Sequence, residues 1–152
     1  MFRRLVVVGA IALLGACEYP ADAELAAGVV RWGTSFGMCA GYCRTELAIA
    51  STSLQLTRTS WNPQQNPPVV QQQAFTEADW KKLLERVDAD KVQGLQETYG
   101  CPDCADGGAE WVEVETATFK KKVTFEHNNP PAELKDAVEA LRALRGRFPE
   151  QP

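Results

Sequence analysis

The chain has 152 residues, of which 45% are hydrophobic and 24% charged, and its 16 basic residues are outnumbered by 20 acidic ones. The resulting net charge of −4 argues against nucleic acid as a partner, because affinity for nucleic acid depends on Lys and Arg side chains that neutralise phosphates. The length suits a single domain with its own hydrophobic core.

Residues 1–16 have the layout of a secretory signal peptide. Arg3 and Arg4 precede an apolar run of 12 residues, LVVVGAIALLGA. This run is shorter than the roughly 20 residues that a membrane-spanning helix needs, so we expect residues 1–16 to be a cleaved signal peptide. Without them the chain keeps 14 basic and 20 acidic residues, a net charge of −6.

The end of this leader carries a second signal. Residues 14–17, Leu-Gly-Ala-Cys, resemble the lipobox of bacterial lipoprotein precursors. The resemblance implies that Cys17 becomes a lipidated N-terminus, that residues 17–27 form a tether, and that the membrane is a partner through this lipid. Glu18 then implies sorting to the outer membrane, on its periplasmic face or its surface, where the organism has one. An alternative is ordinary cleavage after Ala23, which would release a soluble exported protein.

The first half of the remaining chain indicates strands and a helix. A strand is expected near Val29–Trp32, followed by an irregular loop that contains three glycines and two cysteines. The alternating residues 46–61 predict a hairpin with one buried face. The Pro- and Gln-rich residues 61–73 predict an extended surface loop. Thr76 is expected to cap an amphipathic helix over residues 77–87.

The second half repeats this order. After a short connector, residues 110–127 predict a hairpin whose buried face carries Val112 and Val114 in register with Val123 and Phe125. Its run of three lysines at residues 120–122 is typical of a protected edge strand. A final helix is expected over residues 131–146, with a buried stripe at Leu134, Ala137, Val138, Leu141 and Leu144.

This element order predicts the fold class. Two half-buried hairpins and two amphipathic helices bury their apolar faces best as an α+β fold, with an antiparallel sheet of two hairpins covered by two helices in ββαββα order. We expect one domain, residues 28–149. The segments SFGMCAGYC (35–43) and GCPDCADGGAEW (100–111) also resemble a group of small exported bacterial proteins with paired cysteines. That resemblance implies an α+β domain and no particular activity.

The cysteines predict disulfide bonds. Of the five cysteines, lipidation of Cys17 would leave two close pairs, Cys39 with Cys43 and Cys101 with Cys104, in an exported chain. Cys39 and Cys43 on a regular strand would be about 13 Å apart, too far for a bridge, which needs about 4.4 to 6.8 Å. Either this segment curls back on itself or the bridges cross between the two pairs, and we expect crossed bridges.

Two other uses of the same cysteines stay open. Cys39, Cys43, Cys101 and Cys104 have the spacing of a four-sulfur zinc site, so zinc is the alternative cofactor. Cys101 and Cys104 also have the spacing of a thiol-disulfide oxidoreductase. In such enzymes the first cysteine, here Cys101, lies at the N-terminus of a helix that lowers its thiol pKa. The segment after Cys104 predicts a strand and no helix, and Asp103 and Asp106 would destabilise a thiolate.

Other site chemistry has weaker signals in the sequence. Asp103, Asp106 and Glu110 offer oxygen ligands on a Gly-rich loop, an alternative calcium site, although their spacing matches no EF-hand. His127 is the single histidine, and we expect it to be an exposed residue at a strand end. We therefore expect no catalytic residue and no resident cofactor, and the sequence favours a binding or structural module of the cell envelope over an enzyme.

Overall fold

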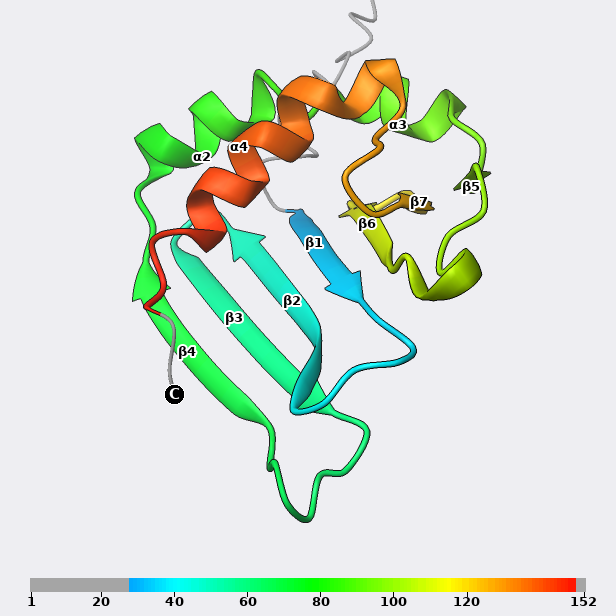
Figure 1. The fold of residues 1–152 in the computed structure, drawn as a ribbon. Coiled ribbons are helices and arrows are strands. Elements are labelled where there is room, and N and C mark those ends of the chain that lie inside the picture. Colours follow the sequence, from blue (N-terminus) through cyan, green and yellow to red (C-terminus); the bar gives the residue numbers. More distant parts are fainter. Residues whose placement is uncertain (1–27, 150–152) are drawn as a thin grey trace, which may run out of the picture.

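The computed structural model describes residues 28–149, which form one mixed sheet with its helices on one face (Figure 1). The predicted signal peptide, Cys17 and the tether lie outside the described residues. The elements in chain order are β1 (Val29–Ser35), β2 (Tyr42–Ala50), β3 (Ser53–Ser60), β4 (Val69–Ala74), α2 (Glu77–Leu84), α3 (Ala89–Gly94), β5 (Thr98–Tyr99), η1 (Cys104–Asp106), β6 (Ala109–Glu115), β7 (Lys120–Glu126), η2 (Ala132–Leu134) and α4 (Lys135–Arg145).

The sheet corrects the predicted fold. Its seven strands lie in the order β4-β3-β2-β1-β6-β7-β5, and all neighbours are antiparallel except β5 and β7, which are parallel. The prediction of an antiparallel sheet of two hairpins covered by two helices in ββαββα order is therefore wrong. Three elements cause the difference, because β4, α3 and β5 were expected to be loop or connector.

Strand β4 was missed because its sequence does not look like a strand. VVQQQA has no apolar alternation, and it follows Pro67 and Pro68. It lies at the edge of the sheet, where its residues alternate between half-buried and exposed. An edge strand needs only one hydrogen-bonded neighbour and little apolar burial, so glutamines are tolerated there.

The connector after α2 hides two short elements. Asp88 caps α3 by accepting a hydrogen bond from the Lys91 backbone N–H at 3.1 Å, and Val92 is buried. The two-residue strand β5 then pairs with Thr124 and Phe125 of β7. Elements of six and two residues are too short to show a periodic pattern in a sequence.

The two predicted hairpins are present. In the first, Leu47 lies opposite Leu56 and Ile49 lies opposite Leu54. In the second, the register is shifted by two residues from the predicted one: Val112 lies opposite Val123, Val114 opposite Lys121 and Glu110 opposite Phe125. The predicted buried face is nevertheless right, since a shift by two residues keeps each side chain on its face.

The helices seal this face. The Thr76 hydroxyl accepts a hydrogen bond from the Asp79 backbone N–H at 3.1 Å, as a cap should, and α2 follows. All five residues of the predicted stripe of the last helix are buried, although its first turn, with Leu134, is the 3-10 helix η2. None of the helices within residues 28–149 is long and apolar enough to cross a membrane.

Candidate functional site

Three loops meet at the end of the sheet away from the helices, and we call them the loop end: residues 36–41, 61–68 and 100–108 (Figure 1). Disulfides Cys39–Cys43 and Cys101–Cys104 bridge two of them, with Cα–Cα distances of 5.6 and 5.5 Å. The expected disulfide bonds are thus confirmed, but the expected crossed pairing is wrong. Gly41 explains this, because its φ of +81° lets the segment curl back between its two cysteines.

Contacts between the loops join them into one body. The Gly37 backbone N–H donates to the Asp103 carboxylate at 3.2 Å. The Trp61 indole N–H donates to the Phe36 carbonyl oxygen at 3.1 Å. The Phe36 ring also packs against Gly108, where an added Cβ would lie 2.3 Å from the ring. Each loop therefore positions another, although they are far apart in sequence.

The loop end displays two large apolar side chains. Met38 is 78% exposed and Trp61 is 65% exposed, and with Val70 on β4 they are the exposed large hydrophobic residues of the described chain. Met38 lies next to the Cys39–Cys43 bridge, and Trp61 is held by its hydrogen bond to the same loop. These side chains are therefore presented to solvent from a constrained backbone.

The Cys101–Cys104 turn is exposed and conformationally unusual. Asp103, Ala105 and Asp106 have φ between +52° and +63°, a region that costs non-glycine residues energy. The Glu126 carboxylate holds the turn by accepting a hydrogen bond from the Cys101 backbone N–H at 3.0 Å. The pKa of Glu126 is lowered because the carboxylate accepts hydrogen bonds from the Asn129 side chain and from this N–H.

The structure separates the residues of the alternative calcium site. Asp103 and Asp106 are exposed in the turn, whereas Glu110 is fully buried on the helix side of β6. Within residues 28–149, no three His, Cys, Asp or Glu side chains lie close enough together to hold a metal ion. The η1 helix that begins at Cys104 has only three residues, so Cys104 does not open an α-helix.

Glu110 instead joins the sheet to α4. Its carboxylate accepts hydrogen bonds from the Trp32 indole at 2.7 Å and from the Arg142 guanidinium, whose Nε lies 2.9 Å from Oε1. The Asn128 backbone N–H donates to Oε2, and His127 Nδ1 lies 3.7 Å from the same atom. A buried carboxylate needs such partners, because removing a charge from water is costly.

His127 differs from the expected exposed residue. Its side chain is 26% exposed, and its Nδ1 is buried without a hydrogen-bond partner. Its ring packs edge-on against Phe36, with 4.9 Å between the ring centroids. His127 therefore packs between the loop end and the buried Glu110 carboxylate.

The face of the sheet opposite the helices is covered by its own charged side chains. Trp111 lies on this face directly beside Gly33, where an added Cβ would be 2.2 Å from the indole. The Arg44 guanidinium and the Lys122 ammonium lie over the ring, 4.7 and 4.5 Å from its centroid. The pKa of Lys122 is lowered, because burial disfavours its charge and the Arg44 charge is near.

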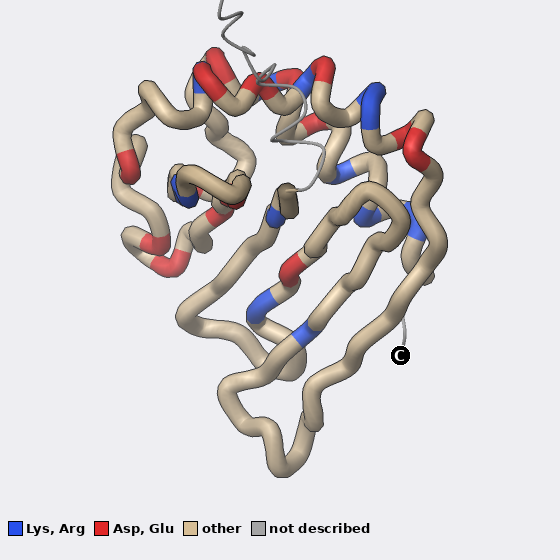
Figure 2. Tube along the Cα trace, turned by 180° about the vertical axis from the view of Figure 1, so that it is seen from behind, with Lys and Arg blue, Asp and Glu red and all other residues tan. Residues whose placement is uncertain are grey.

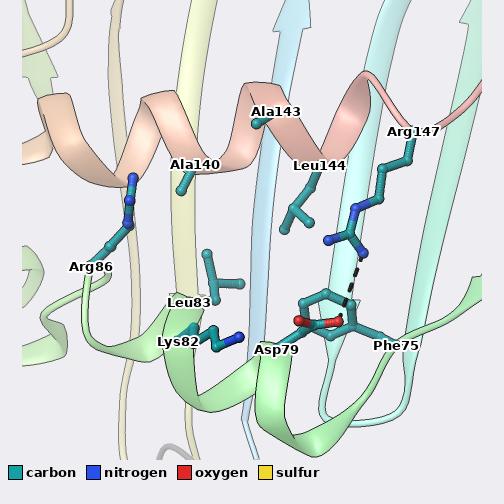
Figure 3. Close-up of a pocket in the computed structure, with 9 residues that line it drawn as sticks. All are labelled: Phe75, Asp79, Lys82, Leu83, Arg86, Ala140, Ala143, Leu144 and Arg147. Atoms are coloured by element: carbon teal, nitrogen blue, oxygen red, sulfur yellow. Dashed lines mark ion pairs between the residues drawn. The ribbon is translucent and has the colours of Figure 1, made fainter.

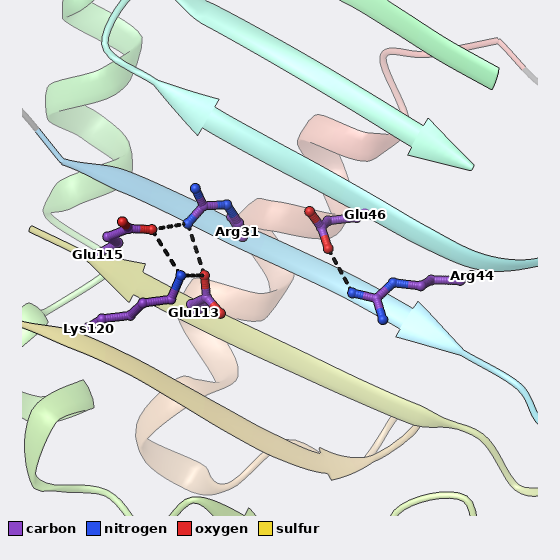
Figure 4. A network of polar contacts seen from close by, with 6 residues as sticks. All are labelled: Arg31, Arg44, Glu46, Glu113, Glu115 and Lys120. Carbon is purple, nitrogen blue, oxygen red and sulfur yellow. Dashed lines mark hydrogen bonds and ion pairs between the residues drawn. The ribbon is translucent and has the colours of Figure 1, made fainter. Parts of the chain in front are cut away.

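A network of ion pairs continues across this face (Figure 4). Arg31 contacts Glu113 at 2.9 Å and also Glu115, and Lys120 reaches the same two carboxylates at 3.1 and 3.2 Å. The pKa of Glu115 is lowered by hydrogen bonds from Arg31 and Lys120. These pairs balance each other's charge, so the network stabilises an exposed sheet face and leaves no strong field for a ligand.

Arg58 is a buried cation that the sequence analysis did not single out. It is 6% exposed, and its Nε and Nη2 atoms are buried without hydrogen-bond partners. Its guanidinium lies 5.2 Å from the Tyr42 ring centroid, a favourable cation–π contact next to the loop end. The alternation of residues 54, 56 and 58 along β3 was the available signal, because it places Arg58 on the apolar face.

A groove of about 240 Å³ lies between α2 and α4 (Figure 3). Its floor is apolar, and Arg147 reaches the Asp79 carboxylate across it at 4.0 Å. Lys82 and Arg86 add two more positive charges at the rim, so the groove would suit an apolar group that carries a negative charge. The lining residues are Phe75, Asp79, Lys82, Leu83, Arg86, Ala140, Ala143, Leu144 and Arg147.

The comparisons with known proteins assign no relative. No protein-family model matches the chain, and a search of the curated proteins returns no match. The loop end, the open sheet face and the groove are therefore interpreted from their own geometry and chemistry.

Proposed function

We propose that this protein is a lipid-anchored binding module of the bacterial envelope, and that it binds a protein partner through its loop end. The observation that carries this proposal is the exposure of Met38 and Trp61, 78% and 65%, with Met38 on a disulfide-bridged loop and Trp61 on a loop that hydrogen bonds to it. A soluble domain normally buries such side chains, and exposed large apolar residues gathered on neighbouring loops are typical of an interaction site.

The residue types support a protein partner. Trp and Met are enriched at protein interfaces, and Trp is among the residues that most often dominate binding energy. Asp103 and Asp106 are exposed in the adjoining turn and give this end a negative rim. The expected partner surface therefore has an apolar pocket with basic residues around it.

The disulfides support binding in a second way. A loop that is already ordered loses little conformational entropy when it binds. The Cys39–Cys43 bridge and the Trp61 indole hydrogen bond both restrict the segment that carries Met38. We propose that the cysteines serve this purpose, and that neither zinc coordination nor thiol-disulfide exchange is their main role.

Site-specific photocrosslinking tests the binding site. A photoreactive residue in place of Trp61, in the full-length chain expressed with its own leader, should capture a discrete protein in intact cells. The matched control replaces Glu139, which is exposed on α4 at the other end of the molecule. Once that protein is purified, Trp61→Ala should weaken its binding by roughly 30-fold, the effect of a loss of about 2 kcal/mol.

Equal capture at Trp61 and Glu139, or unchanged affinity of Trp61→Ala and Met38→Ala, would show that the loop end does not bind. The anchor is tested separately, by mass spectrometry of the mature N-terminus. An acylated peptide that begins at Cys17 supports it, whereas an unmodified peptide that begins at Glu24 refutes it.

A further inference from the structure

Strand β4 leaves one side of its backbone unpaired. It is the first strand in the sheet order, so only β3 lies beside it. The Phe75 backbone N–H donates to the Thr52 carbonyl oxygen, which fixes the alternation of the antiparallel ladder. Residues 69, 71 and 73 therefore point their backbone groups at β3, and Val70, Gln72 and Ala74 point theirs outward. No other segment of residues 28–149 hydrogen bonds to this outer edge.

The outer backbone edge of β4 also lacks the charged side chains that usually protect against pairing, and the contact of the Gln73 side chain with the Arg147 carbonyl oxygen leaves that edge unpaired. Natural edge strands are blunted by charged side chains or covered by another element. The opposite side of the sheet follows that rule, since β7 carries Lys120 to Lys122 and is partly covered by β5. In contrast, residues 61–74 include no charged residue, and this part of the chain is uncoloured in Figure 2.

We propose that a second copy of this chain pairs antiparallel with β4, centred on Gln72, to form a symmetric dimer with a continuous sheet. In this register Gln72 lies opposite Gln72, and Val70 lies opposite Ala74 of the other copy. These are the residues whose backbone groups point outward, and in an antiparallel ladder each such pair exchanges two hydrogen bonds. The proposal goes beyond the binding function of the loop end and does not depend on it.

The side chains fit the same register. Val70 is 54% exposed in a single chain, and Ala74 of the second copy would cover it on the open face. Gln72 already donates to the Gln55 side-chain oxygen at 2.9 Å, so a facing Gln72 would extend this row of amides across the junction. On the helix side, the buried Gln71 side-chain oxygen has no partner, and Gln73 of the second copy would lie opposite Gln71.

A second copy suits this edge better than an arbitrary strand. Self-pairing places identical uncharged segments together, so no like charges face each other, although the chain as a whole is acidic. The two-fold axis of an antiparallel pair is perpendicular to the sheet, so the helices of both copies stay on the same side. The contact is isologous and closes at two chains, which prevents growth into a filament.

Cysteine crosslinking of the full-length chain tests the register. Gln72→Cys places two sulfur-bearing residues opposite each other with Cα atoms about 5.5 Å apart, inside the disulfide range of about 4.4 to 6.8 Å. We expect a disulfide-linked dimer on a non-reducing gel. The matched control is Val70→Cys on the same face, where the two cysteines would be about 13 Å apart and should not join.

A disulfide-linked dimer of the Gln72→Cys variant, with none of the Val70→Cys variant, supports the proposal. Equal crosslinking at both positions, no crosslinking at either, or linkage of residue 72 to a different protein would overturn it. Peptide mapping of Cys39–Cys43 and Cys101–Cys104 confirms that each variant is correctly folded.

A second measurement avoids introduced cysteines. Sedimentation of the purified chain between about 10 μM and 1 mM should show its mass double with concentration. Gln72→Pro removes an outward backbone N–H, which an edge strand tolerates, and should remain a monomer. Gln72→Ala loses the same side chain, with its bond to Gln55, but keeps the N–H and should still dimerise. A wild-type chain that stays monomeric throughout, or a Gln72→Pro variant that dimerises equally well, contradicts the proposal.

Discussion

Glu110 shows how one buried residue connects two layers of the fold. Its carboxylate is fully buried, and it is the point where β6, the Trp32 indole and Arg142 of α4 meet. A buried ion pair is weak evidence of net stabilisation, because desolvation offsets the attraction. Breaking such a pair is nevertheless destabilising, since the remaining charge loses its partner.

Glu110→Gln should therefore lower the free energy of unfolding by about 1 to 3 kcal/mol, because the partly exposed Arg142 guanidinium stays partly hydrated without its carboxylate. The amide can still accept from Trp32, but it leaves the Arg142 guanidinium without a carboxylate. Urea denaturation measures the loss. Glu46→Gln is the matched control, because its partner Arg44 is exposed and that pair should contribute less than about 1 kcal/mol. Equal losses in both variants would refute this account of Glu110.

Glu126 should make the Cys101–Cys104 turn sensitive to acid. The pKa of Glu126 in the folded state lies below its ordinary value of 4.5, because it accepts hydrogen bonds from Asn129 and from the Cys101 N–H. A lowered pKa contributes stability above the unfolded-state pKa, and this contribution is lost as the pH falls through the folded-state pKa. The protection factor of the Cys101 amide, measured by NMR as the intrinsic exchange rate divided by the observed rate at the same pH, should therefore fall below about pH 4.5. Glu126→Gln should abolish this pH dependence.

At this scale the sequence predicted the disulfide-forming residues but not their partners. The pairing depends on the φ of Gly41, which a glycine permits but does not require. Glu110 and Arg58 carried a usable signal, since each continues an apolar alternation with a charged residue, at residues 110, 112 and 114 and at residues 54, 56 and 58. Such a residue on an apolar face indicates a buried polar contact.

Strand β1 has a glycine at the position where a tryptophan of β6 packs against it. Gly33 lies opposite Trp111, and the indole occupies the place of the missing Cβ. Gly33→Ala should therefore destabilise the protein by about 1 to 3 kcal/mol, the usual cost of overpacking. Gly94→Ala at the end of α3 is the control, because nothing lies within 4 Å of its added Cβ. It should stabilise by about 0.4 to 1 kcal/mol in thermal or urea unfolding.

The elements that the sequence predicted are those with a long periodic pattern. The hairpin β2–β3, helix α2 and helix α4 each bury a regular stripe, which the residue order reveals directly. Strand β4 has no such stripe, because its partner β3 supplies the only neighbour and its outer face meets solvent. Strand β4 forms because it pairs with β3, and this pairing leaves no pattern in the residues of β4 themselves.

For the whole molecule, the two disulfides should be modest contributors to stability. Each closes a loop of only three or four residues, so the unfolded chain gains little freedom when a bridge is lost. The entropy model gives about 2 kcal/mol for a loop of this size. Cys101→Ser with Cys104→Ser should thus fold with unchanged circular dichroism and a free energy of unfolding lower by about that amount. Loss of folding would show that the bridge holds the core, against this interpretation.

Topology at this scale could not be read from the sequence. The order β4-β3-β2-β1-β6-β7-β5 places β1 at the centre, with a hairpin on each side. Nothing in the residue pattern says that β6 returns to β1 and not to β4, because both arrangements bury one apolar face. In the observed order Arg142 on α4 contacts Glu110 on β6, a contact between residues far apart in the sequence that the residue pattern does not show.

The direction of β1 has a consequence for the proposed anchored protein. The described chain enters the fold at Val29, and β1 ends at Ser35 beside the loop end, about 20 Å further along the strand. A tether from the bilayer would therefore join the fold at the end of the sheet opposite the loop end, which carries Met38 and Trp61. These two side chains would face away from the lipid headgroups and remain accessible to molecules that diffuse past the membrane.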